Sequence, residues 1–328
     1  MTQAPHLQLI AELQAQIHTC VKEYIRPGQP VAYLDFPDIK NCGDSAIWLG
    51  QIAYLRDQYG MQPAYICRIK DFSRSTMLRR IGDGPIFLRG GGNFGDIWLG
   101  HQKFREMILK KHPSHQVVQF AQSIHFESRE HLESAKRCIG EHKNFVLMVR
   151  DKKSLQFAQQ HFDCVVKLCP DMAFCIGPVA TDNPSLKVLA VLRQDKEKSS
   201  RVDDEIPPDI PCEDWMSESK MDVRRAKCAG LKSAIRDRAF SDLRSRMLNA
   251  AANHRFQRGI QHIARARAIV TDRLHVHICS LLAGKPHAVL DNNYGKVYGF
   301  MDTFSGGTAL SYKAATLTEA IAWARQQA

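Results

Sequence analysis

Short apolar runs alternate with segments of helical spacing along the first half of the chain. Ile10, Leu13, Ile17 and Val21 recur every three or four residues, which predicts an amphipathic helix over 3–25. Apolar runs bounded by glycine, proline or polar residues predict buried strands at 31–36, 64–67, 84–89, 116–120, 145–149 and 164–168. Helical segments are predicted between them at 44–59, 98–111, 130–142 and 155–161. This repeated strand–helix order predicts a parallel sheet with helices on both faces.

The second half of the chain repeats this style from about residue 185. Strands are predicted at 187–192, 268–270 and 287–290, and helices over much of 223–267, over 274–282 and over 317–327. The segment 194–222 is charged and rich in proline, so an exposed loop is predicted there. The predicted fold class is therefore α/β, with two Rossmann-like domains at 1–180 and 181–310 and a central cleft at the carboxyl ends of their strands. The segment 311–328 is predicted to form a C-terminal helix that packs back on the N-terminal domain.

The composition narrows the class of protein and its partners. Of 328 residues, 44% are hydrophobic and 24% are charged, which is the profile of a soluble globular protein with two domains. The net charge of +11 favours an anionic partner, and it leaves a phosphorylated metabolite, a nucleic acid and an acidic membrane surface open. The 10 cysteines show no C-x-x-C spacing, so reduced thiols are expected. Without a secretory signal or a long apolar run, a cytoplasmic location is predicted.

The residues just before the predicted helix at 274–282 carry the strongest chemical signal. They follow a buried strand, and Thr271 and Asp272 are predicted to cap the helix. Arg273 and His275 then fall in its first turn, where backbone N–H groups and the helix dipole already favour an anion. A guanidinium adds a permanent charge, and an imidazole exchanges protons near neutral pH. The site suits a phosphate or a carboxylate; a helix N-terminus with ordinary surface residues is the alternative.

Two further segments place small polar residues between a predicted strand and a helix. In the first, Gly43 permits a tight turn and Asp44 is predicted to cap the helix that follows. In the second, consecutive glycines at 90–92 are typical of a backbone that a ligand or another backbone approaches closely, and Asn93 and Asp96 are predicted to reach substrate hydroxyls. A capping turn and a tight turn are the alternatives without a binding role.

Polar residues also follow three other predicted strands. Arg150 ends one strand and is predicted to point into the cleft, although it can equally bridge two loops. His125 follows another, where a structural histidine is the alternative to a catalytic one. After the strand at 287–290, Asn292 and Lys296 suit a sugar or a phosphate, with a surface turn as the alternative. All three positions fall at the edge of a sheet where open α/β folds bind ligands.

The sequence lacks the signature motifs of several functional classes. The glycine-rich segment has neither the Gly-Lys-Ser/Thr of a Walker A loop nor G-x-G-x-x-G spacing, so a nicotinamide cofactor is disfavoured. The sequence contains no H-E-x-x-H motif, no Cys/His cluster and no G-x-S-x-G elbow, so neither a metal site nor a serine nucleophile is predicted.

Taken in order along the chain, these motifs resemble the polysaccharide pyruvyl transferases, and within that family the bacterial exopolysaccharide biosynthesis members. The resemblance covers about 31–300. It rests on Asn41-x-Gly-Asp44, Gly90-Gly-Gly-Asn-x-Gly-Asp96, Gln122-Ser-Ile, Arg150-Asp, Pro170-Asp, Thr271-Asp-Arg-Leu-His275, Gly284-Lys-Pro286 and Asn292-x-Tyr-Gly-Lys296. The chain departs from the family in having Ala121 where a proline commonly precedes Gln-Ser, which affects the shape of that loop.

The resemblance implies a fold like that of the GT-B glycosyltransferases, with the acceptor on the side of 1–180 and the donor on the side of 181–310. It implies phosphoenolpyruvate as donor, a hydroxyl pair of a glycan as acceptor, and a pyruvate ketal and phosphate as products, with no metal or cofactor. The implied catalytic residues are His275 as acid/base with Arg273 and Arg150. The implied donor-binding residues are Arg150, Arg273, Leu274, His275, Asn292 and Lys296. The implied acceptor-binding residues are Asn41, Asp44, Gly91, Gly92, Asn93, Asp96 and His125.

Two alternatives remain open. A nucleotide-sugar-dependent glycosyltransferase of GT-B type shares the same architecture. A basic module that binds nucleic acid or an anionic polysaccharide agrees with the charge, but no helix-turn-helix, zinc finger or aromatic-basic RNA motif is present, so nucleic acid is not expected. By analogy with the family the acceptor is lipid-linked, and the basic segment 224–246 then rests on anionic lipid at the inner face of the membrane or forms a plain solvated face.

Overall fold

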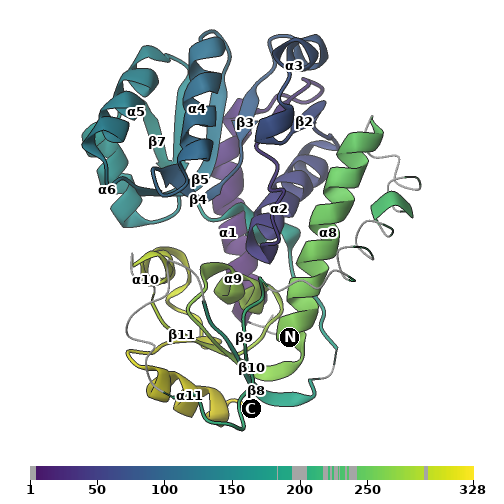
Figure 1. Ribbon diagram of the computed structural model, residues 1–328, viewed down its shortest axis with the longest axis vertical. Coiled ribbons are helices and arrows are strands. Elements are labelled where there is room, and N and C mark those ends of the chain that lie inside the picture. Colours follow the sequence, from purple (N-terminus) through teal and green to yellow (C-terminus); the bar gives the residue numbers. More distant parts are fainter. Residues whose placement is uncertain are drawn as a thin grey trace.

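The computed structural model describes residues 5–182, 184–193, 205–216, 242–291 and 295–328, together with Met221, Arg224, Cys228, 230–232 and Ile235. Two parallel sheets stand one above the other, with helices around both (Figure 1). Short buried strands and longer amphipathic helices follow each other along the chain, as the hydrophobic pattern predicted.

The first sheet has 7 strands in the order β2-β1-β3-β5-β6-β7, with β4 paired to β5. Its strands are β1 Ala32–Leu34, β2 Tyr65–Cys67, β3 Ile86–Leu88, β4 Gly91–Gly95, β5 Val117–His125, β6 Phe145–Val149 and β7 Val165–Leu168. The helices of this part are α1 Pro5–Val21, α2 Cys42–Tyr59, α3 Arg74–Ile81, α4 Leu99–Lys111, α5 Arg129–Glu141 and α6 Lys152–His161, with short helices η1 Lys22–Tyr24, η2 Ile69–Asp71 and η3 Met172–Ile176.

Alternate strand residues bury the two faces of this sheet. Leu34 and the strand residues that point to the same face of the sheet pack under α3 to α6. Tyr33 and the residues that point to the opposite face pack against α1 and α2. Because both faces are covered, the strands carry unbroken apolar runs instead of a polar alternation. The predicted parallel sheet with helices on both faces is confirmed.

The second sheet has 5 parallel strands in the order β12-β11-β10-β8-β9. Its strands are β8 Leu186–Val191, β9 Cys212–Glu213, β10 Ala266–Thr271, β11 His287–Val289 and β12 Ser311–Lys313. The helices of this part are α8 Leu243–Ala264, α9 Leu274–Leu282, α10 Lys296–Phe300, η4 Met301–Ser305 and α11 Leu317–Gln326. The strands predicted at 187–192, 268–270 and 287–290 and the helix at 274–282 are all present.

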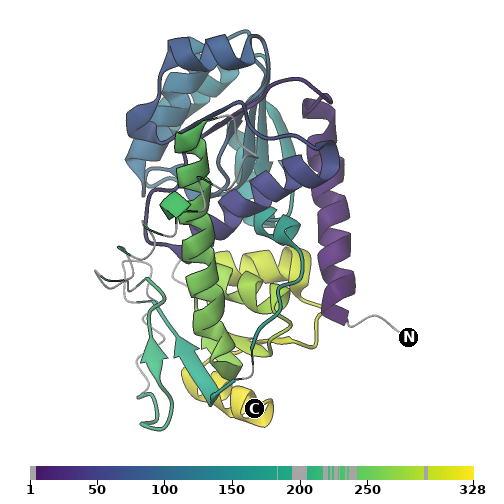
Figure 2. The same ribbon diagram turned by 90° about the vertical axis from the view of Figure 1, so that its right-hand side faces the viewer.

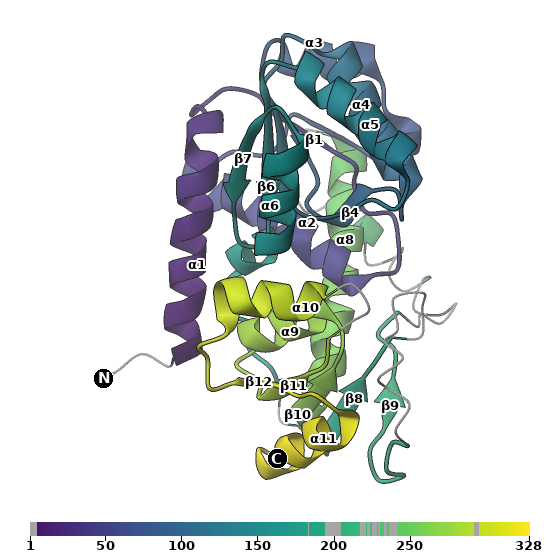
Figure 3. The same cartoon turned by 90° about the vertical axis from the view of Figure 1, so that its left-hand side faces the viewer.

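One apolar cluster continues from the first sheet to the second. It joins Phe120 and Met148 of the first sheet to Val191 and Ile269 of the second through residues of α1, α2, α8 and α9. Figure 2 shows α8 lying against α2, and Figure 3 shows α1 running along the first sheet and ending at the level of α9 and α10. The two parts therefore share a core.

The predictions for α11, for the glycine-rich segment and for the end of β5 were wrong. Helix α11 packs on the second sheet, because its apolar face joins a cluster with Val188 and Val270 instead of reaching the N-terminal part. The glycine-rich segment 90–96 is largely the strand β4, and Gln122 lies within β5 and not after it. The loop predicted at 194–222 falls mostly outside the described residues, and its described part contains β9.

All ten cysteines are free thiols, as predicted. Among the described residues, none of the helices combines the length and the hydropathy that a bilayer crossing requires.

Candidate functional site

A cavity of about 270 Å³ lies where the two sheets meet. The carboxyl ends of β1, β3 and β6 from the first sheet and of β10 from the second lead to it, as do the N-termini of α2 and α9. Its lining residues are Ile39, Asn41, Asp44, Arg89, Gly92, Asn93, Trp98, His101, Arg150, Arg193, Trp215, Met216, Arg273, Leu274, His275 and Lys296. The predicted cleft at the carboxyl ends of the strands thus has a physical counterpart.

The N-terminus of α2 is shaped to receive His275 from the other sheet. Asn41 is the cap of this helix, and its side chain accepts a hydrogen bond of 2.9 Å from the N–H of Gly43. A β-carbon at Gly43 would lie 2.5 Å from the β-carbon of His275, far inside ordinary contact distance. Only glycine at this position lets the imidazole lie against the helix. Asp44 is not the cap that the sequence predicted; its carboxylate instead contacts Arg89 and accepts a bond of 2.7 Å from Asn41.

The N-terminus of α9 places Arg273 at its cap position and His275 in its first turn. Thr271 accepts a hydrogen bond of 3.1 Å from the N–H of Arg273. Asp272 does not cap the helix, since its carboxylate accepts from the N–H of Arg193 at 2.9 Å. Burial raises the pKa of Asp272 to about 6, against the opposing hydrogen bond from Arg193 and the charge of Arg273. The guanidinium of Arg273 lies 2.7 Å from Asp214.

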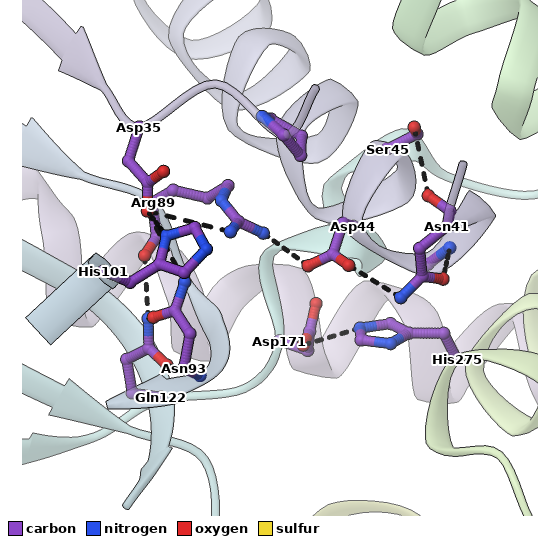
Figure 4. A network of polar contacts seen from close by, with 12 residues as sticks. Asp35, Asn41, Asp44, Ser45, Arg89, Asn93, His101, Gln122, Asp171 and His275 are labelled. Atoms are coloured by element: carbon purple, nitrogen blue, oxygen red, sulfur yellow. Dashed lines mark hydrogen bonds and ion pairs between the residues drawn. The ribbon is translucent and has the colours of Figure 1, made fainter. Parts of the chain in front are cut away.

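Arg150 and His275, from different sheets, both contact the carboxylate of Asp171. Nη1 of Arg150 donates to Asp171 at 2.6 Å, and Nε donates to Ser123 at 3.1 Å. Nε2 of His275 lies 3.4 Å from the same carboxylate oxygen of Asp171 (Figure 4). Burial alone would raise the pKa of Asp171, but the contact with His275 and the charge of Arg150 hold it well below its usual range. Asp171 is therefore a fixed anion that orients both the guanidinium and the imidazole.

A buried polar network supports the other wall of the cavity. Asn93 accepts hydrogen bonds from Arg105 at 3.0 Å and from Gln122 at 2.8 Å. Burial lowers the pKa of Arg105 to about 10, which leaves the guanidinium charged at neutral pH. Arg89 is nearly inaccessible; burial would lower its pKa, but the carboxylates of Asp35 and Asp44 raise it above its ordinary value. Asn93 and Arg89 are thus held at fixed geometry by neighbouring side chains.

The glycines of β4 bring the backbone close to two cations. A β-carbon at Gly92 would lie 3.2 Å from Nη2 of Arg150 and 3.8 Å from Nζ of Lys296. Gly91 has φ of 136°, a conformation that side chains rarely adopt, and its own missing β-carbon would meet Asp44 at 3.7 Å. The glycines thus allow the close approach that the sequence predicted, to cationic side chains at Gly92 and to the backbone of β5 at Gly90 and Gly95, and they do so from a strand.

The structure brings nine of the predicted site residues to the cavity and leaves others outside it. Those in the lining are Asn41, Asp44, Gly92, Asn93, Arg150, Arg273, Leu274, His275 and Lys296. Asp96 instead accepts hydrogen bonds from the N–H groups of Glu127 and Ser128 beside α5, and His125 contacts Glu127 near the surface. Asn292 lies outside the described residues.

The sequence reasoning missed several residues of the site. Asp35 and Arg89 directly follow β1 and β3, so the rule that selected Arg150 at the end of β6 also selects them. His101 sits in the first turn of α4 and had no local signal. Trp98 lines the cavity with a ring that is 52% exposed, and it too had no local signal. Among the described residues, no group of three or more His, Cys, Asp or Glu side chains is arranged to hold a metal ion.

Comparisons with known proteins agree with the geometry. Residues 41–294 match the family model of the polysaccharide pyruvyl transferases. The chain is 30% identical over 308 residues to Pyruvyl transferase 1 of Schizosaccharomyces pombe, which covers 90% of this chain and 74% of that protein. It is 29% identical over 282 residues to EpsO of Bacillus subtilis, covering 84% of this chain and 86% of EpsO.

A solved structure shares the fold. The crystal structure of a functionally uncharacterized protein of Klebsiella pneumoniae superposes with a TM-score of 0.57 at 14% identity, over 93% of this chain and 99% of that one. The motifs quoted from the sequence, the cavity that collects them and the match over most of the chain lead to one conclusion. The chain belongs to the polysaccharide pyruvyl transferase family and is an enzyme of that class.

Proposed function

We propose that this enzyme transfers a pyruvyl group from phosphoenolpyruvate to two hydroxyls of one sugar, in an exopolysaccharide or its lipid-linked precursor, and releases phosphate. The observation that carries the proposal is the joint lining of one cavity by Arg150, Arg273, Lys296 and His275, which come from both sheets. The printed names of the relatives point to pyruvyl transfer. The donor, the ketal product and the cytoplasmic location, at the inner face of the membrane, are parts of this proposal.

The cavity suits a donor that carries both a phosphate and a carboxylate. Arg150 and Arg273 offer planar guanidinium groups that bind such groups through two hydrogen bonds. The N-termini of α2 and α9 add backbone N–H groups and the positive ends of their dipoles. In this proposal these groups hold phosphoenolpyruvate without a cofactor.

His275 is the acid in the proposed reaction. Its imidazole lies between the N-terminus of α2 and Asp171, a carboxylate whose lowered pKa keeps it ionised. Nε2 of His275 lies 3.4 Å from this carboxylate, which orients the imidazole, and an imidazole is the side chain that most often transfers a proton in catalysis. His275 gives its proton to the methylene carbon of the donor, and an oxocarbenium-like centre forms at the carbon that bears the phosphate.

The remaining steps balance protons and bonds. The first sugar hydroxyl attacks that carbon and loses its proton, the carbon–oxygen bond to phosphate breaks, and the second hydroxyl closes the ketal and loses its own proton. Of the two hydroxyl protons, one replaces the proton that became part of the new methyl group, and the other leaves with phosphate. Asp44 and Asn93 line the cavity on the side of the first sheet, where the sugar is proposed to bind.

Thermal denaturation in the presence of candidate donors tests which donor the protein binds. We expect phosphoenolpyruvate to raise the melting temperature of the purified protein, and a panel of nucleotide sugars to leave it unchanged. Protection by a nucleotide sugar in place of phosphoenolpyruvate would favour the glycosyltransferase of similar architecture.

Turnover is tested with a lipid-linked glycan extract and a panel of p-nitrophenyl hexopyranosides. We expect phosphate release and a mass gain of the glycan with wild-type protein. His275→Ala should fold, bind phosphoenolpyruvate and release no phosphate, since it lacks the acid. A His275→Ala enzyme that turns over like wild type would remove the imidazole from the reaction.

A further inference from the structure

His101 lines the cavity, and its imidazole is hydrogen-bonded to the buried carboxylate of Asp35. Nδ1 of His101 lies 2.8 Å from a carboxylate oxygen of Asp35. The imidazole lines the cavity and is 27% exposed, whereas the carboxylate is buried. In the part of the chain that the structure describes, no hydrogen bond occupies Nε2 of His101. With Nδ1–H donating to Asp35, Nε2 presents its lone pair as an acceptor.

The backbone of Asp35 adopts a strained conformation. Asp35 follows β1 with φ of 65°, and it is the one non-glycine residue with positive φ among those described. Nδ2 of Asn93 donates to the same oxygen at 3.5 Å, and the guanidinium of Arg89 lies 3.7 Å from it. Strain of this kind persists where surrounding contacts impose it, and it is concentrated at functional sites.

We propose that His101 is the general base of the reaction, and that Asp35 positions it and fixes its tautomer. The inference rests on the proposed function. In the step it serves, the O–H bond of the attacking sugar hydroxyl breaks, its proton moves to Nε2 of His101, and its electron pair forms the bond to the carbon that bears the phosphate. The proton then passes to solvent or to the departing phosphate, so that no other reactant is needed.

A base separate from His275 lets the attacking hydroxyl lose its proton on the side of the cavity away from the acid, so that the sugar need not reach His275. His101 and His275 stand apart, with Arg89 and Asp44 between them (Figure 4). The sugar therefore approaches with an acid on the side of the second sheet and a base on the side of the first.

Asp44 is the obvious competitor for this role, and its contacts argue against it. One of its carboxylate oxygens contacts the buried guanidinium of Arg89, and the other accepts from Asn41 at 2.7 Å. Both oxygens are thus engaged by donors that come from the protein. Nε2 of His101 is the acceptor that the cavity wall leaves for a hydroxyl.

The charges around the pair bear on its response to pH. Asp35 faces the imidazole directly, Arg89 contacts Asp35 after β3, Arg105 lies one turn further along α4, and Asp44 contacts Arg89 from α2. Arg89 and Arg105 stay charged at every pH of interest, so they do not themselves shape the profile. A base must be unprotonated to act, so kcat/KM of the wild-type enzyme should fall on the acid side of its pH profile.

The test compares His101→Gln and Asp35→Asn with wild type, using phosphate release from phosphoenolpyruvate with the p-nitrophenyl hexopyranosides and the lipid-linked glycan extract. We expect kcat to fall roughly 10²- to 10⁴-fold in His101→Gln, the usual contribution of general base catalysis. The acid limb of the pH profile should disappear in that variant, and its affinity for phosphoenolpyruvate should equal that of wild type. Asp35→Asn should lower kcat as well, because an amide donor turns the imidazole to the other tautomer and places a proton on Nε2.

His161→Gln is the matched control, since this half-buried imidazole at the end of α6 packs on Phe157 and lies outside the cavity. It should keep wild-type turnover and the wild-type pH profile. Phosphate release by wild type together with an unchanged kcat and acid limb in His101→Gln overturns the general base and leaves the proposed function standing. Absence of phosphate release from wild type with every acceptor overturns the proposed function itself, and the assignment of His101 with it.

Discussion

Gly43→Ala tests whether the close approach of α2 to His275 positions the acid. An added β-carbon would lie 2.5 Å from Cβ and from Cγ of His275 and 2.6 Å from Nδ1. Carbon atoms in contact normally keep about 3.5–4.0 Å apart, so the imidazole must retreat by roughly 1 Å. A misplacement of about 1 Å in a catalytic group costs on the order of 10² in rate. We therefore expect turnover to fall about 100-fold.

The stability of the same variant should change far less than its activity. Crowding of a packed site costs about 1–3 kcal/mol, whereas alanine is favoured over glycine inside a helix by roughly 1 kcal/mol. The two effects nearly offset, and a loss of about 0–2 kcal/mol in the free energy of unfolding is expected. Chemical denaturation measures this loss, and phosphate release from phosphoenolpyruvate measures the activity.

Gly140→Ala provides the matched control for Gly43→Ala. Gly140 also lies in a helix, α5, and a β-carbon there would meet nothing within 4 Å. This variant should gain about 0.5–1 kcal/mol of stability and keep wild-type activity. Full activity in Gly43→Ala, at the stability of wild type, would refute the claim that the N-terminus of α2 sets the position of His275.

The remaining predictions concern Asp171 and the two arginines of the proposed donor pocket. Asp171→Asn should cost about 3–5 kcal/mol at pH 7, because it leaves the buried guanidinium of Arg150 without its anion. Since the pKa of Asp171 is lowered by folding, its contribution is complete above the unfolded pKa of about 3.9 and is lost as pH falls below it, so denaturation between about pH 2 and 5 should show a flatter pH dependence in the variant. Arg150→Ala and Arg273→Ala should weaken phosphoenolpyruvate binding at least tenfold in calorimetry; unchanged affinity in both contradicts the proposed donor pocket.

The sheets and much of the cavity could be predicted from the sequence because their signals are local. A strand buried on both faces is an unbroken apolar run, and each run stands beside an amphipathic helix. Polar residues at the carboxyl ends of parallel strands converge by topology alone, which is why Asp44, Arg150 and His275 were selected without coordinates. Asp35 and Arg89 also directly follow strands, so the same rule predicts them as residues of the site.

The errors arose where contacts distant in the chain decide the outcome. The pattern of α11 gives it a buried face but does not say which sheet receives that face. The segment 91–95 contains too few side chains to show a strand, and its pairing with β5 depends on glycines in unusual conformations, since a β-carbon at Gly95 would lie 1.7 Å from the carbonyl oxygen of His125. The pairing of His101 with Asp35 spans 66 residues and leaves no mark on the sequence around either one.

Two of the sequence motifs, Asn-x-Gly-Asp and Thr-Asp-Arg-Leu-His, pack directly against each other. The glycine of Asn-x-Gly-Asp in α2 makes the space that the histidine of Thr-Asp-Arg-Leu-His in α9 fills. Asp171, from the first half of the chain, faces that histidine and also holds Arg150. The position of His275 is thus fixed by residues that belong to the other sheet, through a core that both sheets share. Substitutions in that shared core, remote from the cavity, should then reduce turnover before they unfold the protein, because they shift one sheet relative to the other and separate His275 from Gly43.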